Sequence, residues 1–275
     1  MSGRVLVIGG GVIGLCSAYY AARAGHRVTV MDRQPARRSG CSFGNAGMVV
    51  PSHFVPLAAP GMVALGLKWM WNPKSPFYIK PRLDADLLHW GWRFWRAATA
   101  EQVRRASPLL RDLNLASRAC FEEFAAEPGT DFGLTRRGLL MLCRSAHTLD
   151  EEAHMAARAR ELGLAAEVLD AAGASRLEPG ITMDIAGAVY FPGDCHLSPD
   201  RFMAALEERL RGAGVEFLWE TEANGWRMEA GRVAAVMTGR GELEADEFVV
   251  CGGAWSPRLA SGLGLKLPMQ AGKGY

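Results

Sequence analysis

The residues best able to do chemistry stand near the start of the chain, in the run Gly9-Gly10-Gly11-Val12-Ile13-Gly14. This is a GxGxxG pattern, in which the first glycine permits a tight turn and the second lets the backbone approach a pyrophosphate. The third glycine lets a helix pack closely on a strand, and the N-terminus of that helix offers N–H groups and partial positive charge to phosphates. The pattern therefore predicts a phosphate-binding turn, with these candidate residues: Gly9, Gly11, Val12, Ile13 and Gly14.

The segments around this turn must place it at the edge of a sheet. Arg4–Ile8 is typical of a buried parallel strand, Leu15–Ala24 of a helix that stops at Gly25, and Arg27–Met31 of a second strand. The second strand ends at Asp32, whose carboxylate can accept hydrogen bonds from a ribose diol, and Arg33 follows it. Strand, turn, helix, strand and acid in this order predict a dinucleotide-binding βαβ unit.

Two further segments bear on the ligand. Ser39–Gly47 reads SGCSFGNAG, which can present several backbone N–H groups in a concave nest; a plain surface loop is the alternative. Glu247–Cys251 is typical of another buried strand and runs directly into Gly252-Gly253. Glycines at the carboxyl end of a strand mark a place where a ligand or a second backbone comes close.

GGGVIG, the SFGNAG loop and FVVCGGAWS together resemble the FAD-dependent D-amino acid oxidase superfamily, and within it the bacterial D-amino acid dehydrogenase small-subunit group. The resemblance runs along nearly the whole chain and continues through RRGLLML and the closing PMQAGKGY. It implies FAD as the cofactor, with its ADP half on the glycine turn, Asp32 and Arg33. It also implies that the flavin half lies near Ser42, Asn45, Ala46 and Gly47 of the loop. Ala223 would then touch the adenine, and Gly252 and Gly253 would line the pyrophosphate side.

By the same resemblance, the expected reaction is oxidation of a D-amino acid, or of a D-proline-type cyclic amino acid, by hydride transfer from Cα to flavin N5. The product is an imine, which hydrolyses to a 2-oxo acid unless it is cyclic. The alternatives are a glycine- or sarcosine-type amine oxidase that uses O2, or an NAD-dependent dehydrogenase with the same first βαβ unit. Because the flavin is the electrophile, no catalytic triad is required; His53 and Tyr275 are the weak candidates for the substrate site.

The fold class expected is α/β, a Rossmann-like FAD-binding domain interleaved with an α+β substrate domain. Residues 1–50 and 190–275 form the first and residues 51–189 the insert. In the insert we expect a strand over Arg137–Cys143 and a helix over His147–Leu162, and beyond it a helix over Ser198–Arg211 that begins with Pro199. Proteins of this group continue well past Tyr275, so we expect a fragment, or else a short form completed by a second polypeptide.

Composition narrows the class of protein. The 31 Lys plus Arg and 29 Asp plus Glu give a net charge of +2, too weak to select nucleic acid. The 6 cysteines are widely spaced, which favours free thiols in a reducing compartment, and no metal site is expected. The apolar run Val5–Ala22 carries too many glycines for a membrane span. We expect a cytoplasmic enzyme whose partners are an amino acid and an electron acceptor, in dehydrogenases a respiratory quinone.

Tryptophans cluster in the insert. Trp92 and Trp95 share a helical face, which can mean a core or interdomain helix or, with Arg93 and Arg96 beside them, a belt at a membrane surface. Peripheral contact with the inner face of the plasma membrane therefore stays open.

Overall fold

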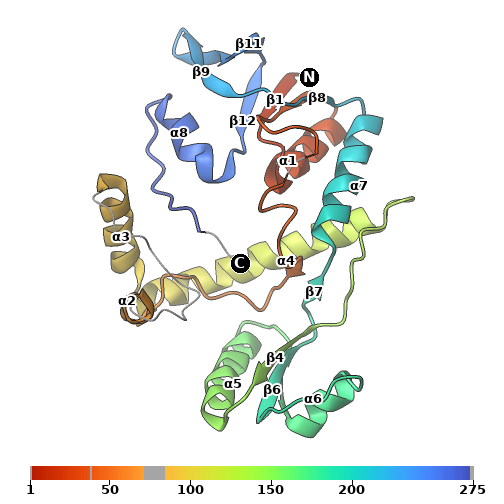
Figure 1. The fold of residues 1–275 in the computed structure, drawn as a ribbon, viewed down its shortest axis with the longest axis vertical. Coiled ribbons are helices and arrows are strands. Elements are labelled where there is room, and N and C mark those ends of the chain that lie inside the picture. The colour runs from red at the N-terminus through yellow and green to blue at the C-terminus, as the bar shows by residue number, and fades with distance from the viewer. Residues whose placement is uncertain (1, 38, 71–83, 273–275) are drawn as a thin grey trace. The chain divides into compact units, whose positions relative to one another are not determined.

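In the computed structural model, residues 2–37, 39–70 and 84–272 are described, and the chain divides into two compact units (Figure 1). Unit 1 contains residues 1–45, 82–91 and 199–275, and unit 2 contains residues 46–81 and 92–198. The chain thus passes from unit 1 to unit 2 within the glycine-rich loop, contributes residues 82–91 to unit 1, and returns to it again at Pro199. The roles predicted from the sequence, a FAD domain for residues 1–50 and 190–275 and a substrate domain for residues 51–189, stay predictions.

Unit 1 is built on a parallel sheet with the strand order β12-β1-β2-β8. Its strands are β1 (Arg4–Ile8), β2 (Arg27–Met31), β8 (Glu216–Leu218) and β12 (Glu247–Val250). Two helices that contact each other, α1 (Val12–Arg23) and α7 (Pro199–Gly212), accompany the sheet, and α1 packs on β1 and β2. The predicted strand, turn, helix and strand are therefore present, with α1 starting three residues before the predicted Leu15.

A second sheet in unit 1, of strands in the order β11-β10-β9, was not predicted. It is an antiparallel meander of β9 (Ala223–Glu229), β10 (Arg232–Thr238) and β11 (Gly241–Glu244). Val236 on β10 joins Leu6, Ile8 and Met31 of the parallel sheet in one buried cluster. Gly231, with a φ of +78°, makes the first hairpin turn and is the signal that could have revealed it. After β12 the chain forms η1 (Gly253–Trp255) and α8 (Ser256–Ser261).

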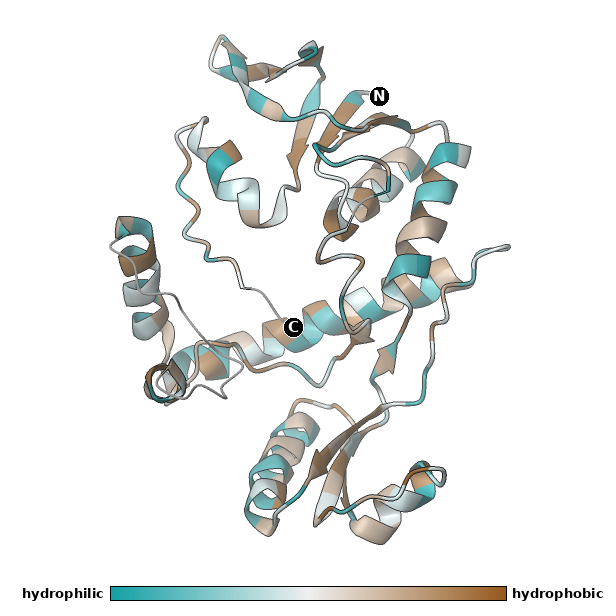
Figure 2. Cartoon of the chain, viewed as in Figure 1, coloured by the Kyte–Doolittle hydropathy of each residue, from teal (hydrophilic) through white to brown (hydrophobic). Residues whose placement is uncertain are grey.

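Unit 2 has an antiparallel sheet with the order β4-β6-β5, formed by β4 (Leu139–Cys143), β6 (Gly187–Phe191) and β5 (Glu167–Asp170). Figure 2 shows β4 largely brown, in keeping with its apolar LLMLC sequence. Helices α5 (Ala146–Glu161) and α6 (Ala171–Leu177) pack on this sheet, and Phe54 is fully buried in the same core. A two-stranded ladder of β3 (Met48–Val49) with β7 (Cys195–His196) also belongs to this unit.

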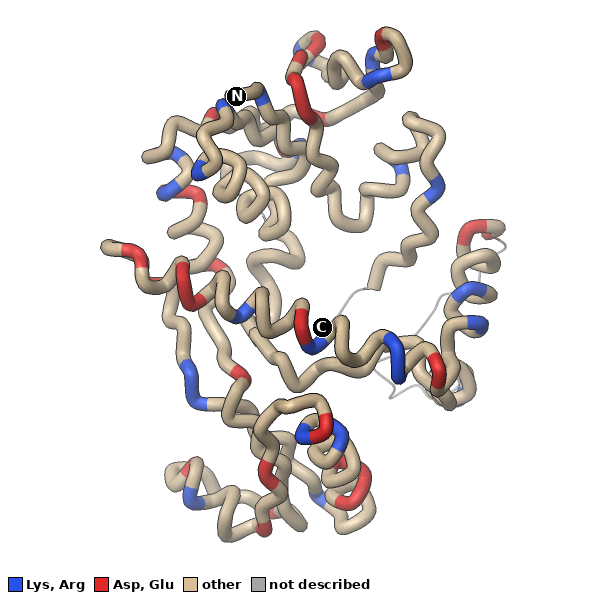
Figure 3. The backbone as a smooth tube through the Cα atoms, turned by 180° about the vertical axis from the view of Figure 1, so that it is seen from behind, with Lys and Arg blue, Asp and Glu red and all other residues tan. Residues whose placement is uncertain are grey.

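Between β3 and β4 the described residues form three helices: α2 (Met62–Met70), α3 (Ala85–Ala97) and α4 (Ala100–Ala125). The hydroxyl of Thr99 accepts a hydrogen bond from the N–H of Gln102 and so caps α4. Basic and acidic residues alternate along α4 (Figure 3), as in the pair between Arg118 and Glu122 at 3.1 Å. The structure therefore gives α4 mixed charge.

Of the alternatives for Trp92 and Trp95, the structure contradicts only burial in a core. Trp92 is 50% exposed and Trp95 is 63% exposed, and α3 buries none of its residues. The indoles of α3 therefore remain largely open to solvent rather than packed in a core. None of the described helices combines the length and the hydropathy needed to cross a bilayer.

Candidate cofactor and substrate site

The glycine turn at the carboxyl end of β1 is closed by backbone contacts that exclude side chains. Gly9 has a φ of +118°, and a Cβ built there would lie 2.3 Å from the carbonyl oxygen of Cys251. A Cβ on Gly14 would lie 1.8 Å from the carbonyl oxygen of Gly9. Helix α1 can therefore approach the sheet this closely only with glycine at both positions, as the sequence pattern predicts.

Asp32 lies beside this turn, at the tip of β2. Its carboxylate accepts hydrogen bonds from the N–H of Gly10 at 2.7 Å and from the N–H of Gln34 at 2.8 Å. Each carboxylate oxygen has room for a further donor, since a carboxylate can accept about four hydrogen bonds. The structure thus fixes Asp32 with its acceptors at the same edge as the glycines, where a ribose diol can reach them.

Ser42 brings the SFGNAG loop to the N-terminus of α1. Its Oγ accepts a hydrogen bond from the N–H of Val12 at 2.9 Å, and it lies 3.2 Å from where a Cβ on Gly11 would be. The sequence placed Ser42 at the flavin half, whereas its contacts within the structure are with the glycine turn. Ile13, the next residue of α1, is 68% exposed, so the helix start is open to solvent.

The end of β12 reaches the same edge. The N–H of Cys251 donates to the carbonyl of Ile8 at 2.8 Å, which places Gly252 against Gly9. Gly253 follows with a φ of +53° and begins η1. Ala223 begins β9 just after Thr221, whose N–H donates to the carbonyl of Asp32 at 2.9 Å. The glycine turn, Asp32, Gly252 and the segment leading to Ala223 therefore lie together at the carboxyl ends of the parallel strands.

Three residues that the sequence analysis missed border this edge. The Trp219 ring lies against Gly10, within 2.8 Å of where a Cβ would be. The Arg33 guanidinium stacks on the Trp255 ring with its carbon 4.1 Å from the centroid, and it lies 3.9 Å from Glu222. The GGAW sequence after a strand was the one available signal, because it sets Trp255 directly behind a glycine turn.

These features suit the ADP half of a dinucleotide. The start of α1 has no side-chain cap from Gly11, and no acidic residue of its first turn repels a phosphate. Glycines at the turn remove the Cβ atoms that would block a pyrophosphate, and Asp32 supplies acceptors for a ribose. The residues present therefore fit FAD.

Comparison with known proteins decides the family. The family model described as "FAD dependent oxidoreductase" (DAO) matches residues 4–275. The chain belongs to this family. FAD as the cofactor is thereby confirmed, and with it the α/β fold with a Rossmann-like FAD domain; the NAD-dependent alternative is not supported.

Relatives within the DAO family include two curated proteins and a solved structure. The D-amino acid dehydrogenase of Methylobacterium nodulans is 39% identical over 99% of this chain and 66% of its own length. That of Cereibacter sphaeroides is 38% identical over 99% of this chain and 63% of its own length. The crystal structure of glycine oxidase from Geobacillus kaustophilus superposes with a TM-score of 0.67 and 25% identity, covering 97% of this chain and 60% of that one. The chain thus spans just under two thirds of these curated DAO relatives.

The remaining predicted residues lie further along the loop. Asn45 donates from Nδ2 to the carbonyl of Cys41 at 2.8 Å and so closes the loop within unit 1. Ala46 is exposed, and Gly47, buried with a φ of +64°, accepts the N–H of Leu197 at 2.8 Å within unit 2. The predicted contacts of these residues with the flavin of a DAO protein stay predictions, and Tyr275 lies outside the described residues.

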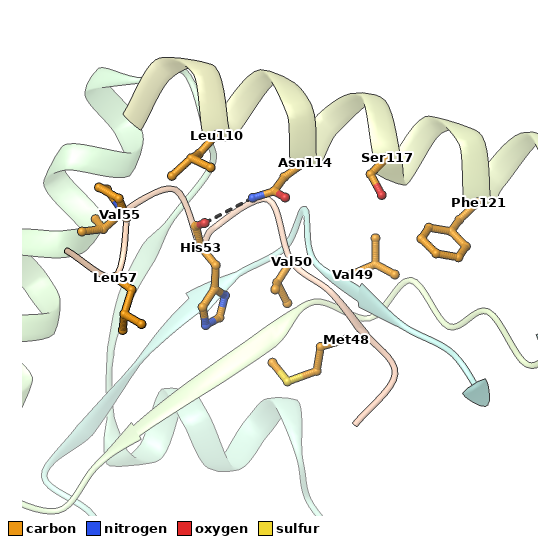
Figure 4. Close-up of a pocket in the computed structure, with 11 residues that line it drawn as sticks. Met48, Val49, Val50, His53, Val55, Leu57, Leu110, Asn114, Ser117 and Phe121 are labelled. Atoms are coloured by element: carbon orange, nitrogen blue, oxygen red, sulfur yellow. Dashed lines mark hydrogen bonds between the residues drawn. The ribbon is translucent and has the colours of Figure 1, made fainter. Parts of the chain in front are cut away.

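His53 lines an open pocket of about 370 Å³ in unit 2, formed by the loop after β3 and by α4 (Figure 4). Its carbonyl accepts a hydrogen bond from Asn114 Nδ2 at 3.2 Å, while Figure 4 shows the imidazole directed away from α4. The other lining residues are mostly apolar: Met48, Val49, Val50, Val55, Pro56, Leu57, Leu110, Ser117 and Phe121. Apolar side chains thus make up most of the lining, while polar atoms contribute about half of the exposed pocket surface, which suits a small ligand with both polar and apolar groups.

Proposed function

We propose that this chain belongs to a FAD-dependent dehydrogenase that oxidises D-amino acids or D-proline-type cyclic amino acids. The observation that carries the proposal is the 39% identity to the D-amino acid dehydrogenase of Methylobacterium nodulans along 99% of this chain. The glycine turn, Asp32 and the apolar pocket beside His53 support it, since they offer a place for the cofactor and a place for a small organic substrate.

In the proposed reaction the amino acid loses a hydride from Cα and a proton from its amino group, which leaves an imine. Bound FAD supplies the hydride acceptor. Water then converts the imine to a 2-oxo acid and ammonia, unless the imine is cyclic and persists. The chain's own part is to hold the cofactor on the glycine turn and Asp32, with the flavin half near Asn45, Ala46 and Gly47. His53 is our candidate to take the proton of the amino group.

The test is the visible spectrum of the purified protein before and after anaerobic addition of D-amino acids, with the L-enantiomers as controls. We expect a flavin spectrum that one or more D-amino acids bleach and the L-enantiomers do not. A flavin that glycine or sarcosine alone bleaches would support the amine oxidase alternative instead. A flavin unchanged by the entire D-amino acid panel would overturn the substrate assignment.

The proposed electron acceptor is a respiratory quinone rather than oxygen, because the curated relatives from Methylobacterium nodulans and Cereibacter sphaeroides are named dehydrogenases. Steady-state oxidation of the substrate should therefore proceed at least about tenfold faster with a soluble quinone analogue than with dissolved oxygen, a difference of some 1.4 kcal/mol in barrier. Equal or faster turnover with oxygen would contradict this part of the proposal.

A quinone acceptor implies contact with the membrane that dissolves it, and we propose that α3 makes this contact from the cytoplasmic side. Leu88, Trp92 and Trp95 are 66%, 50% and 63% exposed and lie on one face of the helix. Exposed indoles are suited to a membrane–water interface. Arg96 stacks on Trp92 with its guanidinium carbon 4.8 Å from the centroid, which places a cation beside the apolar stripe.

Vesicle co-sedimentation tests this contact. A Trp92→Ser, Trp95→Ser variant should lose binding to vesicles that contain anionic lipid, whereas Leu109→Ser, at a 70% exposed position on α4, should retain it. Binding that survives the double substitution would refute the role of α3.

A further inference from the structure

A buried carboxylate in unit 2 takes no part in the function described so far. Asp194, in the turn between β6 and β7, is 2% exposed. Its carboxylate accepts two hydrogen bonds from a single residue, Ser52, through the N–H at 3.1 Å and through Oγ at 2.5 Å. Because a charged group is costly to bury, a carboxylate with these partners signals a fixed structural or functional task.

The main chain holds Asp194 firmly in place. Its N–H donates to the carbonyl of Phe191 at 3.2 Å, and its carbonyl accepts the N–H of Gly138 at 3.0 Å. Nearby, Arg118 on α4 donates to the carbonyl of Gly193 at 2.7 Å, so the turn is tied to α4 as well. The carboxylate is therefore a fixed point, and Ser52 is the residue that it positions.

Ser52 connects this fixed point to His53. Its Oγ lies 3.4 Å from Nδ1 of His53, which gives a line of polar contacts from Asp194 through Ser52 to the imidazole. The backbone of His53 is held on both sides, by its N–H to the carbonyl of Val50 at 3.0 Å and by its carbonyl to Asn114. The next residue, Phe54, is fully buried. The loop therefore presents the imidazole from a rigid base.

The loop so fixed is one wall of the apolar pocket. Val55 and Leu57 belong to it, Val50 directly precedes it, and Leu110 and Ser117 on α4 line the facing side (Figure 4). Met48 and Val49 also line the pocket, and they follow Gly47, the last residue predicted at the flavin half. The chain that we place beside the flavin thus runs directly into the pocket wall.

We propose that Asp194 is a positioning residue that, through Ser52, fixes the loop from Pro51 to Leu57 and sets His53 at the pocket that receives the apolar side chain of the substrate. The pocket assignment rests on the proposed function, whereas the fixing of the loop does not. The substrate class that fits is an amino acid with a linear or branched apolar side chain. The described pocket lining holds no arginine or lysine, so this pocket suits the substrate's side chain rather than its carboxylate.

The first experiment measures the loop without reference to turnover. Hydrogen exchange of the Ser52 and His53 amides should be about tenfold faster in Asp194→Ala than in the parent protein, because the loop loses its fixed point. Asp194→Asn, which keeps one acceptor oxygen, should lie between them. Asp170→Asn is the matched control, since Asp170 accepts a single N–H from Gly173 at the start of α6 and Asn caps helices equally well. Unchanged exchange in Asp194→Ala would overturn the positioning role.

The second experiment separates the pocket from the general activity. Ser117→Leu, which fills the pocket from α4, should raise KM for D-methionine about tenfold and change KM for D-alanine by less than about twofold. Ser52→Ala and Asp194→Asn should each raise KM for D-methionine more than they lower kcat, and their effects should not add in the double variant. Additive effects, or equal effects of Ser117→Leu on both substrates, would refute the proposal.

The outcomes also separate this inference from the proposed function. If the parent protein oxidises no D-amino acid, the proposed function fails, while the exchange measurement still decides whether Asp194 fixes the loop. If the parent protein turns over D-amino acids and the variants leave exchange and KM unchanged, the inference fails and the proposed function stands. If Asp194→Ala does not fold, the exchange rate of the His53 amide is measured in Ser52→Ala instead. That variant loses the hydrogen bond from Ser52 Oγ to Asp194 but keeps the one from the Ser52 N–H.

Discussion

The glycine turn in unit 1 and the His53 loop in unit 2 both present backbone at a site, but they are held in different ways. The glycine turn is fixed by close approach: Gly9, Gly14 and Cys251 leave no room for a Cβ at either glycine. The His53 loop is fixed by side chains, namely Asp194, Asn114 and the buried Phe54. A site made by backbone packing tolerates almost no substitution, whereas a site made by side-chain contacts can lose them one at a time.

The largest expected effect on FAD affinity comes from a substitution in the backbone-packed glycine turn. Gly14→Ala sets a methyl group against the carbonyl oxygen of Gly9, so α1 must move away from β1. We expect FAD affinity, measured by flavin fluorescence on titration, to fall at least about 100-fold. Gly212→Ala is the matched control, because a Cβ there meets nothing within 4 Å and alanine favours a helix. Similar affinities for the two variants would show that the close approach is not what binds the cofactor.

The next effect concerns the acid beside the turn. Asp32→Ala removes the acceptors of the Gly10 and Gln34 N–H groups as well as the proposed ribose ligand. FAD affinity should fall about 10- to 100-fold, as for loss of hydrogen bonds to a charged group worth about 1.5–3 kcal/mol. Asp246→Ala serves as the control, since Asp246 accepts the N–H of Arg4 at 2.7 Å on the same sheet, at the amino end of β1. If only Asp246→Ala lost FAD affinity, the cofactor would have to bind at the amino ends of the strands, and the proposed site would be wrong.

A smaller effect sharpens the role of the SFGNAG loop. Ser42→Ala removes the one hydrogen bond from Val12 and leaves the glycine packing intact. The expected loss is about 1 kcal/mol, or roughly fivefold in FAD affinity. Ser17→Ala, which removes a hydroxyl bonded to the carbonyl of Ile13 within the same helix, should leave FAD affinity unchanged. A loss of 100-fold in Ser42→Ala would mean that this loop, too, is fixed by packing.

The smallest expected effect tests the side-chain-fixed loop through pH. Burial raises the pKa of Asp194, and its hydrogen bonds to Ser52 offset this only in part. A raised pKa means that the contribution of Asp194 to folding stability is greatest below the unfolded pKa of about 3.9 and is lost as the pH rises through the folded pKa.

Asp194→Asn does not titrate, so the comparison isolates this group. When the pH is lowered from 7 to 4.5, the free energy of unfolding of the parent protein should rise relative to that of Asp194→Asn. The expected rise is on the order of 1 kcal/mol or less. Urea denaturation of both proteins at the two pH values measures this difference. A difference that moves the other way would mean that Asp194 is held ionised in the folded protein.

Much of unit 1 could be predicted because its signals are local. GxGxxG, the strands on each side and Asp32 occupy one short stretch, and their geometry follows from chain direction and the need of α1 to pack on β1. Pro199 marked the start of α7 because proline suits the first turn of a helix. The meander from Ala223 to Glu244 was missed since its strands carry polar residues and its core face shows only against the parallel sheet.

The candidate site in unit 2 could be predicted only in part. His53 was named because of its place after the glycine-rich loop, but nothing in the sequence connected it with Asp194 or Asn114. The apolar spacing of Trp92 and Trp95 left a core or interdomain helix and a membrane-surface belt both open, and the structure leaves both side chains exposed. Spacing shows which residues share a helix face, and it does not show what that face meets.

The sequence by itself determined the phosphate-binding turn, the acid at the tip of β2 and the FAD family, because these depend on residues adjacent in the chain and on glycines that no other residue can replace. Only the tertiary structure decided that Ser42 meets α1, that Arg33 stacks on Trp255 and that Asp194 holds Ser52. Each of these contacts joins segments far apart in the chain. Folding brings such groups together through the packing of whole units, which leaves no pattern in the local sequence.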